Sequence, residues 1–451
     1  MNPPRPDDGP LTVDGGAPTV DGRIRRRSLW HHRDFLALWT GQAVSRAGSQ
    51  VSLLALPLVA IVLLHATTFE VGALTATATL PFLLVGLPAG ALVDRLPRRR
   101  VLIVADVGRC AALASVPVAW AAGSLTVGQL YVVSLVAGSL SVLFDVAYQS
   151  YLPELVAADQ LVEGNGKLAA TDAGAQVAGP GIAGLLIGAV GAANAVSADG
   201  ASYVVSFVSL MLVRARPHER AREPRTTKLR REIAEGLRFV RGEPRILAVA
   251  GATATSNLFS SMAEAVLLVF AVRRLGLSAG RLGIIFALAN VGALLGAVSA
   301  ARIARRIGVG PTIVWSIAMA GLGPLAYPLA TRSSAAVLIL AGGAVMGFGG
   351  VVYNVNQVSV RQTLCPPRLQ GRMNATVRFI VWGTMPLGGF AGGALGTLVG
   401  LRPTLWIAAI GGLGAFLWLL PSPIPGMRHM PEHVDDALGA AEPSGSQPAV
   451  G

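Results

Sequence analysis

Seven ionisable side chains occur inside long apolar stretches of the sequence, where charge is costly in a membrane and marks a functional site by default. They are Arg46, Asp106, Arg109, Asp145, Asp172, Asp199 and Glu264. Asp145 and Glu264 lie about midway along their stretches and are predicted to lose hydration there. Since loss of hydration favours the neutral form of a carboxyl group, both are candidates for reversible proton binding. Arg46 opposes this interpretation, because a permanent ion pair with either acid would keep that acid ionised.

Four of the seven residues have simpler explanations. Asp106 and Arg109 lie three residues apart and share one helix face, which predicts a local ion pair. Asp172 and Asp199 lie near the ends of their stretches and are predicted to sit at the membrane interface. For the remaining three residues, the sequence leaves open both a role in a cavity and a role as a structural ion partner.

Uncharged polar and aromatic side chains accompany these charges in the second half of the sequence. The polar ones are Asn257, Asn290, Tyr353, Asn354, Asn356 and Gln357. Trp382, close to Phe379, adds an aromatic surface. Together with Arg46, these residues predict a mixed polar and aromatic cavity suited to an amphiphilic organic molecule.

Enzymatic and cofactor chemistry is not indicated by the motifs. The stretch Gly179–Gly184 matches the glycine pattern of dinucleotide-binding loops, but no strand precedes it and Pro180 lies inside an apolar stretch. The sequence contains no P-loop, no HExxH pair and no nucleophile elbow. The two cysteines, Cys110 and Cys365, lack metal-ligand spacing. We therefore predict no enzyme activity, no cofactor and no metal.

The elements that carry these residues are long apolar stretches. Hydrophobic residues make up 53% of the 451-residue chain and charged residues only 14%, against about 25% charged in a soluble domain. A bilayer core needs roughly 20 apolar residues per helix, and twelve such stretches occur. They are 35–64, 70–93, 101–122, 128–149, 168–190, 193–213, 246–271, 282–301, 311–330, 335–360, 375–400 and 403–421. Since the alternating segments of a β-barrel do not occur, we predict an all-α membrane protein with twelve transmembrane helices.

The distribution of basic residues predicts the orientation of the chain. Twelve spans place both ends of the chain on one side of the membrane. Of the 37 Lys and Arg residues, 30 belong to the tails and the connections on that side, and five to the connections on the other side. Basic connections stay in the cytoplasm, so both termini are predicted to be cytoplasmic, with the chain in the plasma (inner) membrane. The net charge of +13 then faces anionic lipid, and we predict no nucleic-acid partner.

One long polar interval divides the spans six and six. The predicted organisation is a disordered tail at 1–34, a six-helix bundle at 35–213, a basic linker at 214–245, a second six-helix bundle at 246–421 and a disordered tail at 422–451. In the linker, apolar residues recur at helical spacing and predict an amphipathic helix on the inner membrane surface. These residues are Leu229, Ile233, Leu237 and Val240. Two related bundles with a site between them are typical of a secondary transporter.

The connection after the second span resembles a motif of the major facilitator superfamily, Gly-x-Leu-x-Asp-Arg-x-Gly-Arg-Arg/Lys. The matching residues are Gly90, Leu92, Asp94, Arg95, Arg98 and Arg99, and Pro97 replaces the second glycine. The resemblance implies a gating role, in which the motif stabilises the outward-facing state by contacting the start of the eleventh span, near Arg372 and Arg378. The alternative is that these arginines only determine topology.

Two further motifs support the resemblance, which covers roughly residues 35–421. In the fifth span, Gly179, Pro180 and Gly184 are similar to a helix-bend motif of drug–proton antiporters. The stretch Pro366–Arg372 looks like the branch that contains enterobactin exporters and macrolide-efflux-like proteins, as does the presence of Asp106 with Arg109.

The resemblance implies proton-coupled export of a small amphiphilic compound, such as a drug, a secondary metabolite or a siderophore, by a monomer. An importer or a lipid flippase of the same fold remains an alternative. A membrane sensor that transports nothing is a third, although both tails are short and polar and so favour transport.

Overall fold

The computed structural model describes residues 29–93, 95–157, 160–214 and 229–431. Over these residues the chain is helical and contains no strand. Eleven helices are long and apolar enough to cross a membrane. The remaining crossing consists of α2 (Thr68–Leu84) and α3 (Gly86–Val93), which follow one another with a break at Val85. The predicted all-α fold with twelve membrane crossings is confirmed.

Pro88 accounts for the break in the second crossing. A proline inside a helix lacks an N–H donor, and its ring collides with the carbonyl group four residues earlier. That carbonyl belongs to Leu84, where α2 ends. The chain resumes helical hydrogen bonding at once, since the Ala89 amide donates to the Val85 carbonyl oxygen at 2.8 Å.

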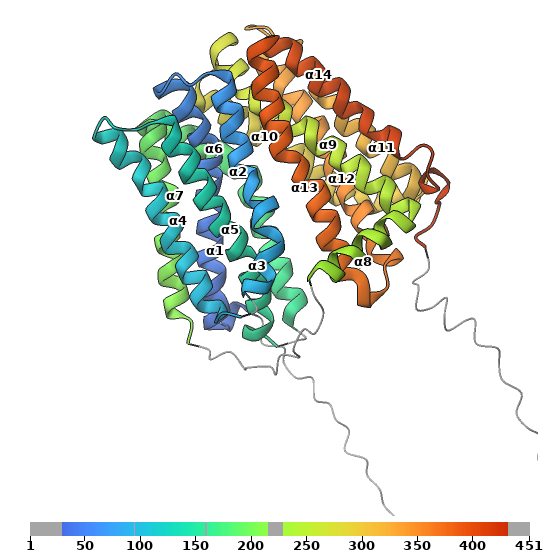
Figure 1. Cartoon of the computed structure of the whole chain (residues 1–451). Helices are drawn as coiled ribbons and strands as arrows, with labels where there is room; N and C mark the ends of the chain where they lie inside the picture. The colour runs from blue at the N-terminus through green and yellow to red at the C-terminus, as the bar shows by residue number, and fades with distance from the viewer. Residues whose placement is uncertain (1–28, 94, 158–159, 215–228, 432–451) are drawn as a thin grey trace, which may run out of the picture.

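The two halves follow one another along the chain (Figure 1). Besides α2 and α3, the first half comprises α1 (Arg33–Leu58) with η2 (Val59–Leu63), α4 (Arg98–Ala121), α5 (Val127–Leu155), α6 (Leu161–Val190) and α7 (Ala192–Leu212). The second half comprises α8 (Leu229–Gly242), α9 (Pro244–Val269) with η4 (Phe270–Arg274), α10 (Ala279–Ile307), α11 (Val309–Leu322) with η5 (Gly323–Ala326), α12 (Ala335–Leu364), α13 (Pro367–Leu398) and α14 (Leu401–Leu413) with η6 (Gly414–Trp418).

Each half opens with the same helix–turn–helix unit. The first crossing of each half ends in a π-helical turn, η2 after α1 and η4 after α9. The connection then passes through a positive φ, 50° at His65 in the first half and 71° at Gly276 in the second. The next helix is capped by a hydroxyl group, from Thr67 before α2 and from Ser278 before α10. This shared local structure is expected of parallel repeats related by an axis along the membrane normal.

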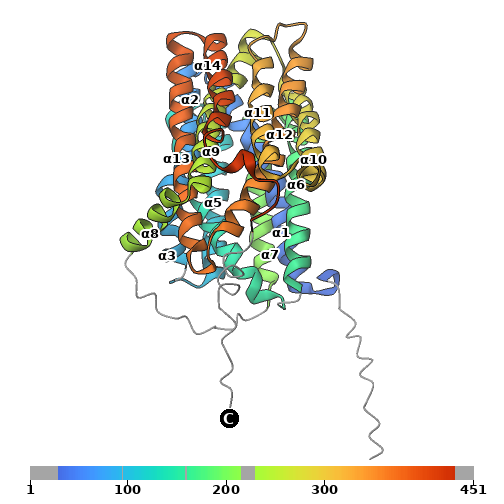
Figure 2. The ribbon, with the colours of Figure 1, turned by 90° about the vertical axis from the view of Figure 1, so that its right-hand side faces the viewer.

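The halves meet along two seams that are built from glycine. In one seam α2 lies beside α13, where a Cβ added to Gly72 would lie 2.4 Å from the Cα of Gly393. In the other, α10 lies beside α6 (Figure 2), where a Cβ added to Gly283 would lie 2.7 Å from the Cα of Gly184. Small residues allow this close approach of helix backbones in lipid. Each seam thus joins the second crossing of one half to the fifth of the other.

Both seams lie toward the end of the molecule opposite α8. Toward the α8 end the halves diverge, and α3 and the start of α13 separate (Figure 1). Gly90 in α3 accordingly has open space where a Cβ would be. Near the point of divergence, the rings of Phe82 and Trp382 meet edge to face with centroids 4.7 Å apart.

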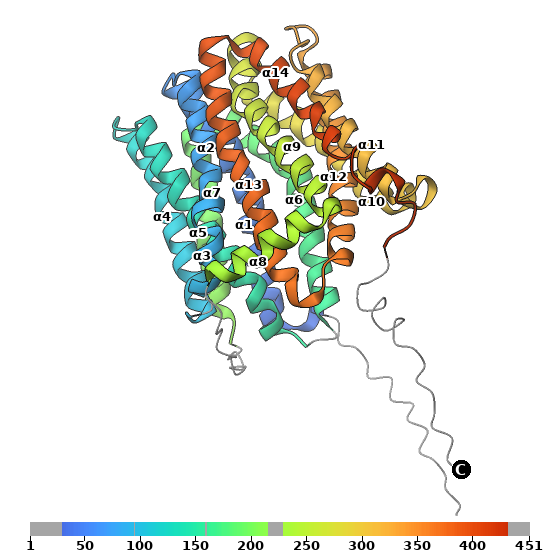
Figure 3. The same ribbon diagram turned by 45° about the vertical axis from the view of Figure 1, so that its right-hand side comes forward.

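The predicted amphipathic segment is the helix α8, which lies across the start of α13 (Figure 3). A Cβ on Gly236 would lie 2.7 Å from the Arg372 carbonyl oxygen, and Val240 is fully buried. Part of the predicted C-terminal tail is also packed, because the Gly310 amide at the start of α11 donates to the Met427 carbonyl oxygen at 2.7 Å. Residues 1–28 and 432–451 of the predicted tails lie outside the described residues.

Candidate functional site

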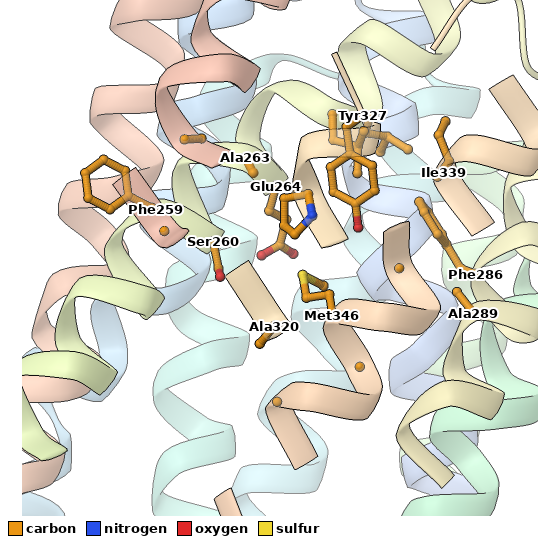
Figure 4. A pocket seen from close by; sticks show the side chains of 18 of the residues that line it. Phe259, Ser260, Ala263, Glu264, Phe286, Ala289, Ala320, Tyr327, Ile339 and Met346 are labelled. Carbon is orange, nitrogen blue, oxygen red and sulfur yellow. The ribbon is translucent and has the colours of Figure 1, made fainter. Parts of the chain in front are cut away.

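A cavity of about 600 Å³ lies between the two halves, mostly on the side of the second half. Helices α1, α2 and α6 line it from the first half, and α9, α10, α11, α12 and α14 line it from the second. Its wall is largely apolar, with Phe259, Phe286, Tyr327 and Met346 as large side chains. Figure 4 shows this part of the wall from close by.

Glu264 on α9 is the one acidic residue among those that line the cavity. Its carboxylate points into the space that Tyr327 and Met346 also face (Figure 4). Its side chain is exposed to the space of the cavity. Within the described part of the chain it accepts no hydrogen bond and forms no ion pair, unlike the other predicted proton-binding candidate. An acid without a counter-charge in apolar surroundings is suited to bind a proton or a cation.

Asp145, the other candidate, is held by an arginine. Arg46 donates from Nη2 to Oδ1 of Asp145 at 2.7 Å, and its Nε lies 3.3 Å from Oδ1 of Asp172. The three side chains come from α1, α5 and α6, and each is about half exposed. Asp145 therefore has the ion pair that the sequence left open, and Glu264 does not. Neither Arg46 nor Asp145 is among the residues that line the cavity.

Two of the predicted cavity residues do line the cavity, Asn257 and Asn290. The side-chain amide of Asn257 donates to the Val381 carbonyl oxygen at 3.1 Å. That of Asn290 donates to the Gln176 carbonyl oxygen at 2.5 Å, which joins α10 to α6 across the seam. Both residues thus use their N–H groups to fix the wall, while their side-chain oxygens form no described hydrogen bond.

The remaining predicted cavity residues lie elsewhere in the second half. The Tyr353 hydroxyl lies 2.7 Å from the Thr253 hydroxyl and ties α12 to α9. Gln357 donates to the side chain of Asn354 at 2.9 Å, and Asn356 donates to its own helix backbone at 2.8 Å. Trp382 belongs to the seam between α2 and α13, against Phe82. The structure does not bring these five residues into the cavity.

The predicted gating motif binds neighbouring helices of its own half. Arg98 pairs with Glu154 and donates to the Ser150 carbonyl oxygen at 2.9 Å, which fastens α4 to α5. Arg99 donates to the Leu210 carbonyl oxygen at 3.0 Å and so caps the end of α7. Arg95 is exposed. Asp94, the acid of the motif, lies outside the described residues, so its gating role stays a prediction.

The predicted helix-bend motif packs α6 against two other helices. A Cβ on Gly179 would lie 2.4 Å from the side chain of Gln50 on α1. The Pro180 carbonyl oxygen would lie 2.4 Å from a Cβ on Gly283, and Gly184 approaches the same residue. Pro180 also lines the cavity. The motif thus forms part of the glycine seam beside the cavity.

Two residues have contacts that the sequence did not predict. Arg273 was interpreted only as a basic residue of an outer connection, yet it donates to the carbonyl oxygen of Ala66 in the other half at 2.5 Å. Asp199 was placed at the membrane interface, yet only 1% of it is exposed. In both cases the decisive contact is with a residue far away in the sequence, so local sequence carries no signal for it.

Twelve membrane-crossing helices in two repeated halves, with a cavity between the halves, define the class of secondary transporters. The family model of the Major Facilitator Superfamily matches residues 38–384 and, in a second overlapping match, residues 252–441. The chain belongs to the major facilitator superfamily, and the resemblance seen in the motifs is confirmed.

Several relatives are exporters. The multidrug efflux pump Tap of Mycolicibacterium fortuitum is 30% identical over 389 residues, which cover 82% of this chain and 90% of that protein. The enterobactin exporter EntS of Escherichia coli O1:K1 / APEC is 26% identical over 397 residues, 86% of each chain. Among solved structures, a bacterial homologue of the iron transporter ferroportin in the inward-facing state superposes with a TM-score of 0.68 at 18% identity, covering 86% of this chain and 98% of that one. The chain is thus a transporter of this superfamily with efflux pumps among its relatives.

Proposed function

We propose that this transporter exports a small amphiphilic organic cation in exchange for protons. The observation that carries the proposal is Glu264, a carboxylate that faces an apolar cavity without a described partner. A cavity of about 600 Å³ has the size of sites that hold drug-sized molecules, roughly 300–1,000 Å³. The relationship to Tap and EntS, both named as exporters, supports export over import.

Exchange follows from competition for one carboxylate. In the empty cavity, apolar surroundings favour the neutral form of Glu264. A bound cation favours the charged form by the same electrostatics, so substrate binding expels the proton. Each ligand lowers the affinity for the other by the same factor, because binding coupling is reciprocal. One carboxylate can then bind the proton on one side of the membrane and the cation on the other.

The described arrangement corresponds to the state that loads substrate. The seams close the halves at the end opposite α8, and the halves diverge at the α8 end. The excess of basic residues assigns the α8 end to the cytoplasm. An exporter takes up its substrate from this side, and rocking of the halves about the seams then exposes the cavity to the other side.

The test is substrate-induced proton release from purified protein in weak buffer. It uses a lipophilic organic cation whose binding is confirmed for each variant. We expect release from the wild type and from Asp145→Asn, since Asp145 is paired with Arg46, and no release from Glu264→Gln. Undiminished release from Glu264→Gln would contradict the proposal. Loss of proton release in Asp145→Asn alone would indicate that the exchanged proton binds in the first half, at Asp145.

A second experiment separates export from the alternatives. The same cation is placed either inside or outside proteoliposomes across which a proton gradient is imposed. An exporter moves the cation against the proton flow. Movement of the cation together with protons would indicate an importer. Movement of labelled lipid without the cation would indicate a flippase, and no movement of either would leave a sensor.

A further inference from the structure

A second group of charged residues lies inside the first half, away from the cavity. It consists of Asp106 and Arg109 on α4 and Asp199 on α7, which are 0%, 5% and 1% exposed. None of the three lines the cavity. The exchange mechanism above does not use them, and neither the gating motif nor the helix-bend motif includes them. The cluster therefore contains two carboxylates and only one guanidinium group.

Arg109 is committed to Asp106. Its Nη2 donates to Oδ1 of Asp106 at 2.5 Å. Its guanidinium carbon lies 4.3 Å from the ring centroid of Phe144 and 4.1 Å from that of Tyr203, so aromatic faces cover it on both sides. Cation–π contacts of this kind hold the guanidinium in place. The predicted local ion pair between Asp106 and Arg109 is confirmed.

Asp199 has no cation of its own. Within the described part of the chain it forms no ion pair, and its carboxylate has two hydroxyl partners, Ser52 and Ser202, the latter at 3.2 Å. Helix α1 covers it so closely that a Cβ on Gly48 would lie 2.9 Å from its Oδ1. Water is thereby kept away from the carboxylate, and an ionised carboxylate in such a place is costly.

The groups that face Asp199 leave its charge uncompensated. From α1 the buried hydroxyl of Ser52 lies beside the Asp199 carboxylate. Arg46, also on α1, is paired with Asp145 instead. From α4 it is Arg109, which already binds Asp106, and from α7 itself Tyr203. With both acids ionised, the cluster would carry one uncompensated negative charge.

We propose that Asp199 is a proton-binding site, separate from the cavity. In the described arrangement, α1 covers this site and prevents the proton from exchanging. A neutral carboxyl group removes the uncompensated charge and can donate to a neighbouring acceptor. Because α1 covers the site, the proton can exchange only when α1 moves away from α7. The proposal is independent of the transported substrate.

The test compares wild type with Asp199→Asn, a neutral replacement of similar shape. If the folded protein holds this proton and the unfolded chain does not, unfolding releases it, and stability falls as the pH rises. In a series from pH ~3 to ~9, we therefore expect the two proteins to unfold at the same temperature below pH ~4, where the Asp carboxyl group is protonated in the unfolded chain as well. As the pH rises, the midpoint of the wild type should fall, and that of Asp199→Asn should stay higher. Equal pH dependence of the two, or a variant less stable at every pH, would overturn the proposal.

Infrared spectroscopy supplies the second readout. A carbonyl-stretch band of a neutral carboxylic acid should be present in the wild type, persist in Glu264→Gln and lose intensity in Asp199→Asn. Asp106→Asn is the matched control, because it leaves Arg109 without its counter-ion and should destabilise the protein at every pH. If the band is lost in Asp106→Asn but kept in Asp199→Asn, the proton resides on Asp106 and the assignment is wrong. Failure of Asp199→Asn to fold would also contradict it, since the amide matches a neutral acid in shape and charge.

Discussion

Arg273 of the second half donates from Nη2 to the carbonyl oxygen of Ala66 in the first half, at 2.5 Å. Ala66 lies in the connection between η2 and α2, and Arg273 lies in η4, so the bond joins the equivalent turns of the two repeats. The position equivalent to Arg273 in the first half is Val62, which cannot return such a bond. One polar contact therefore reinforces the two glycine seams where the halves are closed.

We expect Arg273→Gln to increase the fraction of molecules in which the two halves are open at the end opposite α8. A hydrogen bond from a charged group contributes about 1.5–3 kcal/mol, which corresponds to a roughly tenfold or larger change in the ratio of the two states. Spin labels at Ser124 and Val399, both exposed and in different halves, would report the change as a longer distance between the labels.

Arg274→Gln is the control, because it removes the same charge from the next residue, whose side chain has no described bond to the first half. Its distance distribution should match that of the wild type. Equal shifts in both variants would mean that net charge, and not the bond to Ala66, determines the population.

Gly184→Ala should push α6 and α10 apart. The added Cβ would lie 2.8 Å from the Cα of Gly283 and 2.7 Å from the Ala279 carbonyl oxygen, and backbone atoms cannot move aside as a flexible side chain can. Overpacking costs about 1–3 kcal/mol, so the midpoint of thermal unfolding should fall. Gly188→Ala, one turn further along α6, meets nothing within 4 Å and should be neutral or slightly stabilising. Similar results for both variants would exclude close helix packing as the cause.

Asp94→Asn tests the predicted gating role of the motif after the second crossing. The amide keeps the shape of the side chain but removes the charge that would strengthen its hydrogen bonds. We expect transport in proteoliposomes to fall roughly tenfold or more, with insertion and substrate binding retained. Arg100→Gln, at an exposed neighbouring residue, should transport normally. Full activity of Asp94→Asn would leave the motif with a role in topology alone.

Cysteine labelling tests the orientation of the chain. Cysteines at Ser124 and Arg332 should react with an impermeant maleimide added to intact cells, and one at Gly242 should react only after lysis. The native Cys365 should stay silent near neutral pH, because burial raises the pKa of its thiol to about 11 and the thiolate is the reactive form. The other native cysteine, Cys110, is replaced by Ser for this experiment. Labelling of Gly242→Cys in intact cells would reverse the orientation.

The sequence predicted the membrane crossings well because each depends on a local property, the length of an apolar stretch. The exception is instructive, since the break at Val85 follows from Pro88 and could have been read from the sequence. Glu264 was found for the same local reason, as an acid in the middle of an apolar helix. Its lack of a hydrogen-bond or ion-pair partner could not be predicted, because that depends on every helix that packs around Glu264.

The predicted lining of the cavity was harder to judge for a geometric reason. Successive residues of a helix point about 100° apart, so Tyr353, Asn354, Asn356 and Gln357 cannot all face one space. In the structure Tyr353 bonds to α9, Gln357 bonds to Asn354, and Asn356 bonds to its own helix backbone. The pairing of Arg46 with Asp145, 99 residues apart, and the burial of Asp199 under α1 likewise depend on which faces of the helices meet.

The glycine seams give the contact between the halves an unusual mechanical character. Most packed helices interlock, because side chains of one fill the spaces between side chains of the other. At Gly72 against Gly393, and at Gly184 against Gly283, backbone meets backbone and no side chain interlocks. At such a contact, one bundle can rotate against the other without side chains having to disengage. The barrier to rocking should then depend more on the few polar contacts across the halves, such as those of Arg273 and Asn290, than on the seams themselves.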